Sequence, residues 1–271
     1  MDAPPPLFEP KVSPDDFHVL VVSSGFAHFG DLASRSGEFS RYRRQSTWTL
    51  ASLGDVPGGD FDVSIVVSAD VAELPAALSV ATALARRRDT TILLAPAPIV
   101  GDETLVDDAL VVAGPGTDAF ANFALLVRTI LAPVLTEQLV CVDWSDILTI
   151  LDEGTQAMLI EGTGTSATEA IAALSSELAA AGVAKLHGLC GVLSSAQGVP
   201  MRAYHVYFDM LKAWLGSEAY IVVAAPEHYG EGASASVLAI TNPTWRWRKR
   251  RSAPVQEFAP EDLPPFLRKQ A

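Results

Sequence analysis

The first half of the chain alternates short apolar runs with longer helical patterns. Runs of strand length occupy residues 18–22, 63–67 and 91–95, and a helical pattern at residues 71–88 ends in three arginines. Between Phe120 and Val134, apolar residues recur at steps of three and four, which is the period of one face of a helix. This alternation is typical of a mostly parallel α/β sheet.

A second α/β unit follows with the same alternation. Its helices are predicted at residues 146–153, 167–180 and 204–215, and its strands at 157–161, 189–194, 220–225 and 234–240. Gly182 follows the second of these helices, where glycine favours a helix C-cap. The sequence therefore predicts two α/β units joined by a helix.

Composition is that of a folded protein, because 49% of the residues are hydrophobic and 19% are charged. The apolar runs are too short to span a membrane, and the N-terminus lacks the basic start and apolar stretch of a secretory signal. The two cysteines make neither a disulfide framework nor a zinc motif. We therefore expect a cytoplasmic protein without a metal site.

Charge is distributed unevenly along the chain. The net charge is −13, but residues 241–271 alone carry +4, so the body before them carries −17. An acidic body argues against nucleic acid as the ligand. A basic tail favours an anionic partner or surface for the tail alone.

Two carboxylates three residues apart, Asp143 and Asp146, lie where a strand or loop enters a predicted helix. One interpretation is helix capping, in which Asp accepts hydrogen bonds from the free backbone N–H groups of the first turn. The other is a pair of acids presented to a metal ion, a water molecule or a partner.

Residues 139–164 resemble the FtsZ segment that leads from the central helix into the second domain. The FtsZ pattern is Asn-x-Asp-Phe-Ala-Asp-Val. Here Cys141 stands at the Asn position, Asp143 and Asp146 match the two Asp, and Trp144 matches the Phe. In FtsZ this synergy loop enters the nucleotide pocket of the next subunit, where its acids help to position the attacking water. The resemblance implies that Asp143, Trp144 and Asp146 contact a partner subunit.

The loops that hold GTP in FtsZ are altered. Residues 61–69 and 90–98 resemble the strands that flank the signature Gly-Gly-Gly-Thr-Gly-Thr-Gly, whose glycines let backbone N–H groups reach phosphate. Between them the chain reads Asp70-Val71-Ala72-Glu73-Leu74-Pro75, and Asp70 and Glu73 would repel phosphate. The earlier loop keeps one glycine, Gly25. The resemblance therefore implies a pseudo-GTPase that binds neither GTP nor GDP and is not an enzyme.

A fragment similar to that signature, Gly162-Thr163-Gly164-Thr165, occurs in the second unit. It follows the synergy loop rather than the strand that precedes the phosphates. We interpret it as a turn between strand and helix, with Ser166 or Thr165 as the N-cap.

The last ten residues resemble the C-terminal peptide of FtsZ, Asp-Ile-Pro-Ala-Phe-Leu-Arg. Pro264, Phe266, Leu267 and Arg268 match this pattern, and Leu263 stands in place of its Ile. Prolines limit the unbound ensemble, while Phe and Leu supply anchors for a docking peptide. The resemblance implies that this peptide binds the division adaptors that recognise the FtsZ tail.

A basic aromatic cluster precedes that peptide and consists of Trp245, Arg246, Trp247, Arg248, Lys249, Arg250 and Arg251. Tryptophan with Arg and Lys suits the interface of a membrane that carries anionic lipid. A solvated start to a linker is the alternative. The cluster is too short for a stable helix by itself, so we expect any membrane contact to be weak.

Together these features predict a tubulin/FtsZ-like α/β fold. We expect a flexible arm at residues 1–16, a reduced Rossmann-type nucleotide-binding-like domain at 17–116, a central helix at 117–138, a second α/β domain at 139–240 and a flexible tail at 241–271. The implied function is division-site assembly with FtsZ or with itself. The alternatives are a self-polymerising membrane scaffold that needs no nucleotide, and an unusual GTPase.

Overall fold

The structure is a computed structural model that describes residues 17–25, 29–43, 45–87, 90–96, 109–136, 142–182, 186–228 and 230–242. The predicted arm at residues 1–16, the basic aromatic cluster and the C-terminal peptide lie outside these residues, as does Cys141. Among the described residues, no helix is long and apolar enough to cross a membrane.

The first half is a parallel sheet whose spatial order is β2-β1-β3-β4-β5. Its strands are β1 (His18–Ser23), β2 (Thr47–Ala51), β3 (Val63–Val67), β4 (Thr90–Ala95) and β5 (Ala109–Ala113), and its helices are α1 (Phe29–Arg35), α2 (Glu38–Tyr42) and α3 (Leu74–Ala85). Every residue of β3 and β5 is buried. Burial on both faces explains why such strands are continuous apolar runs.

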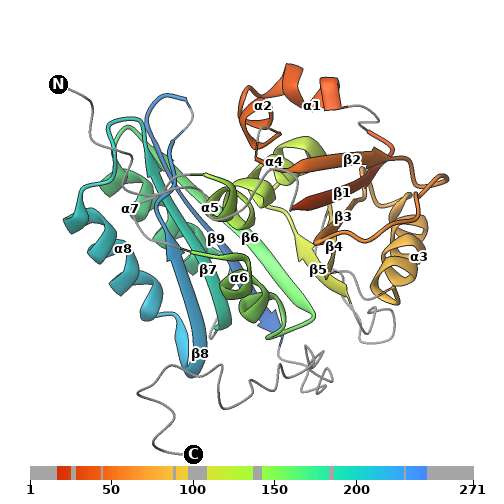
Figure 1. The fold of residues 1–271 in the computed structure, drawn as a ribbon. Helices are drawn as coiled ribbons and strands as arrows, with labels where there is room; N and C mark the ends of the chain where they lie inside the picture. Colours follow the sequence, from red (N-terminus) through yellow and green to blue (C-terminus); the bar gives the residue numbers. More distant parts are fainter. Residues whose placement is uncertain are drawn as a thin grey trace, which may run out of the picture.

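The second half continues the same sheet (Figure 1). Its helices are α4 (Ala119–Ile130), α5 (Ala132–Leu135), α6 (Trp144–Leu151), α7 (Ala167–Ala180) and α8 (Met201–Lys212), and its strands are β6 (Gln156–Gly164), β7 (Leu186–Ser195), β8 (Leu215–Ala224) and β9 (Ala233–Asn242). β6 pairs in parallel with β5, and β9 runs antiparallel between β6 and β7. The predicted mostly parallel α/β architecture is confirmed.

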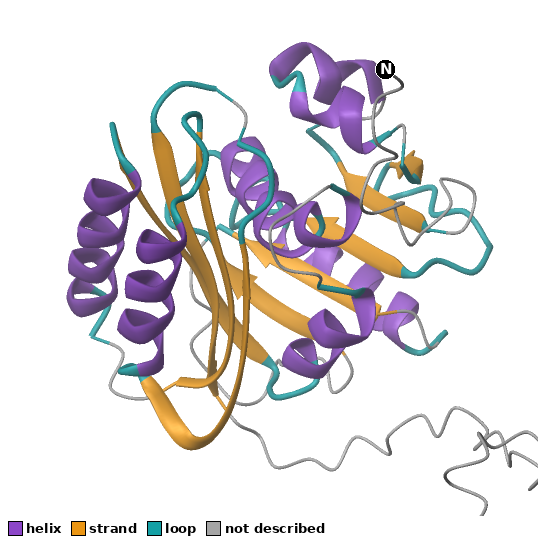
Figure 2. Cartoon of the chain, turned by 60° about the vertical axis from the view of Figure 1, so that its left-hand side comes forward, coloured by secondary structure: helices purple, strands orange, loops and turns teal. Residues whose placement is uncertain are grey.

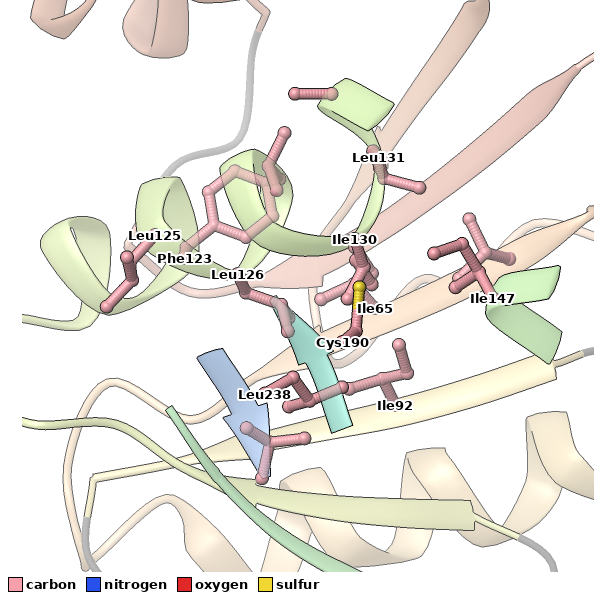
Figure 3. Packing of buried hydrophobic residues seen from close by; sticks show 14 of the residues in the cluster. Ile65, Ile92, Phe123, Leu125, Leu126, Ile130, Leu131, Ile147, Cys190 and Leu238 are labelled. Carbon is pink, nitrogen blue, oxygen red and sulfur yellow. The ribbon is translucent and has the colours of Figure 1, made fainter. Parts of the chain in front are cut away.

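Helices cover both faces of the sheet. α7 and α8 pack on one face of the second half, and α4 and α6 lie on the other (Figure 2). The core under α4 draws on both halves, since Ile65 and Ile92 from the first meet Cys190 and Leu238 from the second (Figure 3). The helix that joins the halves in sequence thus also covers the junction between them.

Several predicted boundaries differ from the observed ones. Residues 71–73 form a turn, so α3 begins at Leu74, and the helix predicted at 204–215 is α8, which ends at Lys212. The predicted central helix is divided: α4 ends at Ile130 and α5 is a separate turn. Pro133 lies in α5, and a proline has no N–H with which to continue the α4 hydrogen bonds.

The turn predicted at residues 162–165 is wrong. Gly162, Thr163 and Gly164 are the last residues of β6, and the bend begins at Thr165. Ser166 is the N-cap of α7, and its hydroxyl accepts a hydrogen bond from the Glu169 N–H at 3.3 Å. These glycines do not form a turn. They allow β6 to pack closely against α7, because a side chain at either position would meet atoms of that helix.

Candidate functional site

The acids predicted to contact a partner form a reciprocal capping box at the start of α6. The Asp143 carboxylate accepts from the Asp146 N–H at 3.1 Å, and the Asp146 carboxylate accepts from the Asp143 N–H at 3.0 Å. The Ser145 hydroxyl also donates to Asp143 at 2.6 Å. Capping is therefore confirmed, and both carboxylates remain exposed at the surface.

Trp144 fixes this loop to the end of the sheet. Its half-buried ring meets Phe17 edge to face, with the ring centroids 5.2 Å apart and the planes at 81°. Phe17 is buried and directly precedes β1. The capping box therefore lies at the amino end of the parallel strands, and Trp144 is at least partly a structural anchor.

The loops that follow β1 and β3 meet at the opposite end, because β1 and β3 are parallel neighbours. The Ser24 hydroxyl lies 2.7 Å from each carboxylate oxygen of Glu73, to which it donates, and the Ala69 N–H donates to the same carboxylate at 3.2 Å. The Glu73 N–H in turn donates to Asp70 at 3.0 Å. Ser24 and Ala69 thus hold the Glu73 carboxylate beside the start of α3.

The two regions lie on opposite sides of the first half. Phe17 and Ser24 flank the six residues of β1 and are seven steps apart, so at about 3.3 Å per residue about 23 Å separate them. A protein with different surfaces at its two ends can form head-to-tail contacts, in which each subunit uses a different surface from its neighbour. The arrangement therefore allows one partner at the capping box and another at the Glu73 loop.

A polar cluster joins elements that are distant in the sequence. In this Arg128 cluster, Arg128 of α4 lies 3.4 Å from the Glu38 carboxylate of α2 and 3.0 Å from the Glu161 carboxylate of β6. Burial raises the pKa of Glu38, and the Arg128 charge opposes that rise. Sequence analysis missed the cluster because no local pattern relates its three members.

A groove lies beyond the end of β5. This β5–β6 groove has a volume of about 290 Å³ and is lined by residues 113–115, residues 158–161 of β6, Glu177 and Ala180 of α7, and the C-cap residue Ala181. Sequence analysis missed it as well, since it depends on how far one strand extends past its neighbour.

Metal and thiol chemistry find no support among the described residues. Within them, no three His, Cys, Asp or Glu side chains are grouped as a metal site would require. Cys190 is fully buried and donates to the Thr129 carbonyl at 3.3 Å, and burial raises the pKa of its thiol to about 12. This thiol is therefore protonated and inaccessible at neutral pH.

The fold matches solved structures, although the sequence matches no protein-family model and no curated protein. The W319Y mutant of FtsZ from M. jannaschii shares 14% identity over 84% of this chain and 91% of its own, with a TM-score of 0.62. An empty FtsZ dimer from the same organism shares 15%, covers 84% and 89%, and has a TM-score of 0.62. CetZ from Methanosaeta thermophila shares 14%, covers 83% and 87%, and has a TM-score of 0.56.

Proposed function

We propose, from this FtsZ-type fold, that the protein is an FtsZ-like assembly subunit that neither binds nor hydrolyses GTP. The observation that carries the proposal is the Glu73 carboxylate, which accepts from Ser24 and Ala69 where the loops of β1 and β3 meet. A phosphate placed there would have to displace this carboxylate and would meet Asp70 beside it. Like charges in such proximity oppose binding.

The opposite end carries the proposed contact with a partner subunit. Asp143 and Asp146 are exposed there, and Trp144 holds their loop on Phe17. The partner is FtsZ, through its nucleotide end, or a second copy of this chain. One M. jannaschii protein with this fold is a dimer, which supports self-association. A subunit with the synergy loop but without GTP would cap a filament or change its turnover.

The tail extends this role to the division site. Leu263, Pro264, Phe266, Leu267 and Arg268 would bind the adaptors that recognise the FtsZ tail. Because the anchors are few and apolar, affinity would depend mainly on burial of Phe266 and Leu267.

Calorimetry with GTP and GDP tests the loss of the nucleotide site. We expect no binding heat at millimolar nucleotide, because the Glu73 carboxylate already takes the hydrogen bonds of Ser24 and Ala69. An FtsZ that retains the glycine signature is the positive control. Micromolar binding by this chain would instead establish a nucleotide-dependent switch or an unusual GTPase.

A charge-removing double variant tests the partner contact separately from the fold. Asn caps a helix as well as Asp does, so Asp143→Asn with Asp146→Asn should keep α6 intact while removing both charges. We expect this variant to lose its effect on FtsZ assembly, measured by light scattering and pelleting. Asp209→Asn, at an exposed acid on α8, is the matched control. If the double variant affected FtsZ assembly as strongly as the unmodified protein does, the synergy-loop mechanism would be contradicted.

A second candidate function follows from the basic aromatic cluster at residues 245–251. A protein that polymerises with itself on anionic membrane would use this cluster as its surface contact. Pelleting of the pure protein with anionic liposomes in the absence of FtsZ would favour this scaffold over the first proposal.

A further inference from the structure

Strand β1 connects the two surfaces that a head-to-tail contact would use. Phe17, directly before β1, meets the Trp144 ring of the capping-box loop. Ser24, directly after β1, donates to Glu73 of the Glu73 loop, which comprises residues 68–73. The two surfaces therefore lie near one line, the axis of β1. A second copy shifted along this line would bring its Glu73 loop to the capping box of the first, which is the arrangement of a head-to-tail row.

The surface at the start of β1 is negatively charged. The carboxylates of Asp143 and Asp146 are exposed there, on either side of the Trp144 anchor. Asp62 is exposed as well, and its carboxylate accepts a hydrogen bond from the N–H of His18, the first residue of β1, at 2.7 Å. Three acids thus lie where a head-to-tail neighbour would make contact.

The Glu73 loop is negatively charged too, since its charged residues are Asp70 and Glu73 and it contains no Lys or Arg. Asp70 is exposed and accepts from the Glu73 N–H at 3.0 Å, while Ser24 and Ala69 donate to the Glu73 carboxylate. These donors are neutral, so the hydrogen bonds fix the two carboxylates in place without cancelling their charge. In a row of identical copies, acids would therefore meet acids at every contact, and like charges there oppose binding.

We infer that this repulsion keeps the chain from stacking on itself, so that the head-to-tail neighbour at the capping box is a different protein. The inference rests on the proposed use of the two ends as contact surfaces, and it selects FtsZ over a second copy as the partner. Charge acts here on specificity, because repulsion of the wrong partner discriminates as well as attraction of the right one. The repulsion reaches about 10 Å at 0.1 M salt, so added salt weakens it.

Reversing the charge of one end should create the row that the natural charges prevent. Val71, 68% exposed, and Ala72 lie at the surface of the Glu73 loop. Asp70→Asn with Val71→Lys and Ala72→Lys, the Lys-loop variant, leaves the Glu73 carboxylate in place. By sedimentation velocity at about 50 mM salt, we expect a monomeric unmodified chain and a Lys-loop variant that associates at least about tenfold more tightly. Added salt should dissociate the variant's oligomers.

Two further variants assign that association to the proposed contact. Adding Asp143→Asn and Asp146→Asn to the Lys-loop variant should abolish the oligomers. The matched control makes the same three types of substitution at exposed positions of α7 and α8, as Asp209→Asn with Val206→Lys and Ala172→Lys, and should remain monomeric. A Lys-loop variant that stays monomeric, or a control that associates equally, would overturn the inference.

The unmodified chain supplies a test that needs no variant. Its self-association should be no stronger at about 50 mM salt than at about 1 M, where charges are screened within about 3 Å. Self-association that is stronger at low salt would overturn the inference, because the ends would then attract each other. No FtsZ is present in these measurements, so their outcome is separate from that of the FtsZ assembly assay, which tests the proposed function.

Discussion

Replacing Arg128 by Met is expected to lower the free energy of unfolding by about 3 kcal/mol, because two largely buried carboxylates lose their counter-charge. The Glu38 and Glu161 side chains are only 12% and 24% exposed, and that of Arg128 is 30% exposed. Removing one partner of a buried ion pair lowers the free energy of unfolding strongly, even where the intact pair contributes little to stability, because the other charge stays buried without a partner. Urea denaturation of the variant and the unmodified protein measures the difference.

The loss should depend on pH in a defined direction. Burial raises the pKa of Glu38, so this carboxyl is protonated more readily in the folded chain than in the unfolded chain. Its charged form therefore destabilises the fold as pH rises through that raised pKa. Without Arg128 the pKa of Glu38 rises further. The destabilisation should be largest at neutral pH and shrink as the pH falls through the raised pKa of Glu38, because the carboxyl then takes up a proton.

An exposed ion pair on α2, the helix that also carries Glu38, supplies the control. Arg41 of α2 pairs with Glu227 at 2.9 Å, but these side chains are 53% and 61% exposed. Arg41→Met should therefore change stability by less than about 1 kcal/mol. Equal losses in the two variants, or a loss for Arg128→Met that does not change with pH, would contradict the role assigned to the Arg128 cluster.

Gly162→Ala is expected to destabilise the fold by about 3 kcal/mol, because the added methyl group would meet the backbone of α7. A Cβ on Gly162 would lie 2.5 Å from the Ala170 carbonyl oxygen and 2.7 Å from the Leu174 Cα. Neither is the end of a flexible side chain, so the helix as a whole would have to move away from β6. Thermal unfolding should show a clearly lowered midpoint.

Gly54→Ala separates this effect from the general cost of replacing glycine. A Cβ on Gly54 would meet nothing within 4 Å, and its backbone is not in the left-handed region. This control should unfold at nearly the same temperature as the unmodified protein. If Gly162→Ala lowered the unfolding midpoint no more than Gly54→Ala does, α7 and β6 would not be packed as closely as the structure shows.

The capping box explains why sequence analysis left the role of Asp143 and Asp146 open. The same two carboxylates cap α6 and remain exposed, so structure and partner contact are not exclusive explanations of this motif. Substitution by Asn distinguishes them because it keeps the cap and removes the charge. Ala substitution would combine both losses.

The sequence by itself determined the features that depend on neighbours within a few residues. The observed bounds of β3 and α7 are those predicted. Capping of α6 was one of two interpretations of its acids, and Ser166 was one of two candidates for the N-cap of α7. Period and capping are local properties, which is why they can be recognised without knowledge of the fold. β2 was missed because, as an edge strand, it is only partly buried and lacks a continuous apolar run.

Only the tertiary structure decided what the remaining side chains do. Ser24 reaches Glu73, and Arg128 reaches Glu38, because strands and helices that are distant in the sequence lie side by side. Gly162 and Gly164 belong to a fragment that is similar in sequence to the FtsZ glycine signature. In the structure they lie on β6, where the absence of a side chain lets α7 pack closely against the strand. Such roles depend on non-local packing, in which the partner of a residue is set by topology and not by its neighbours in the chain.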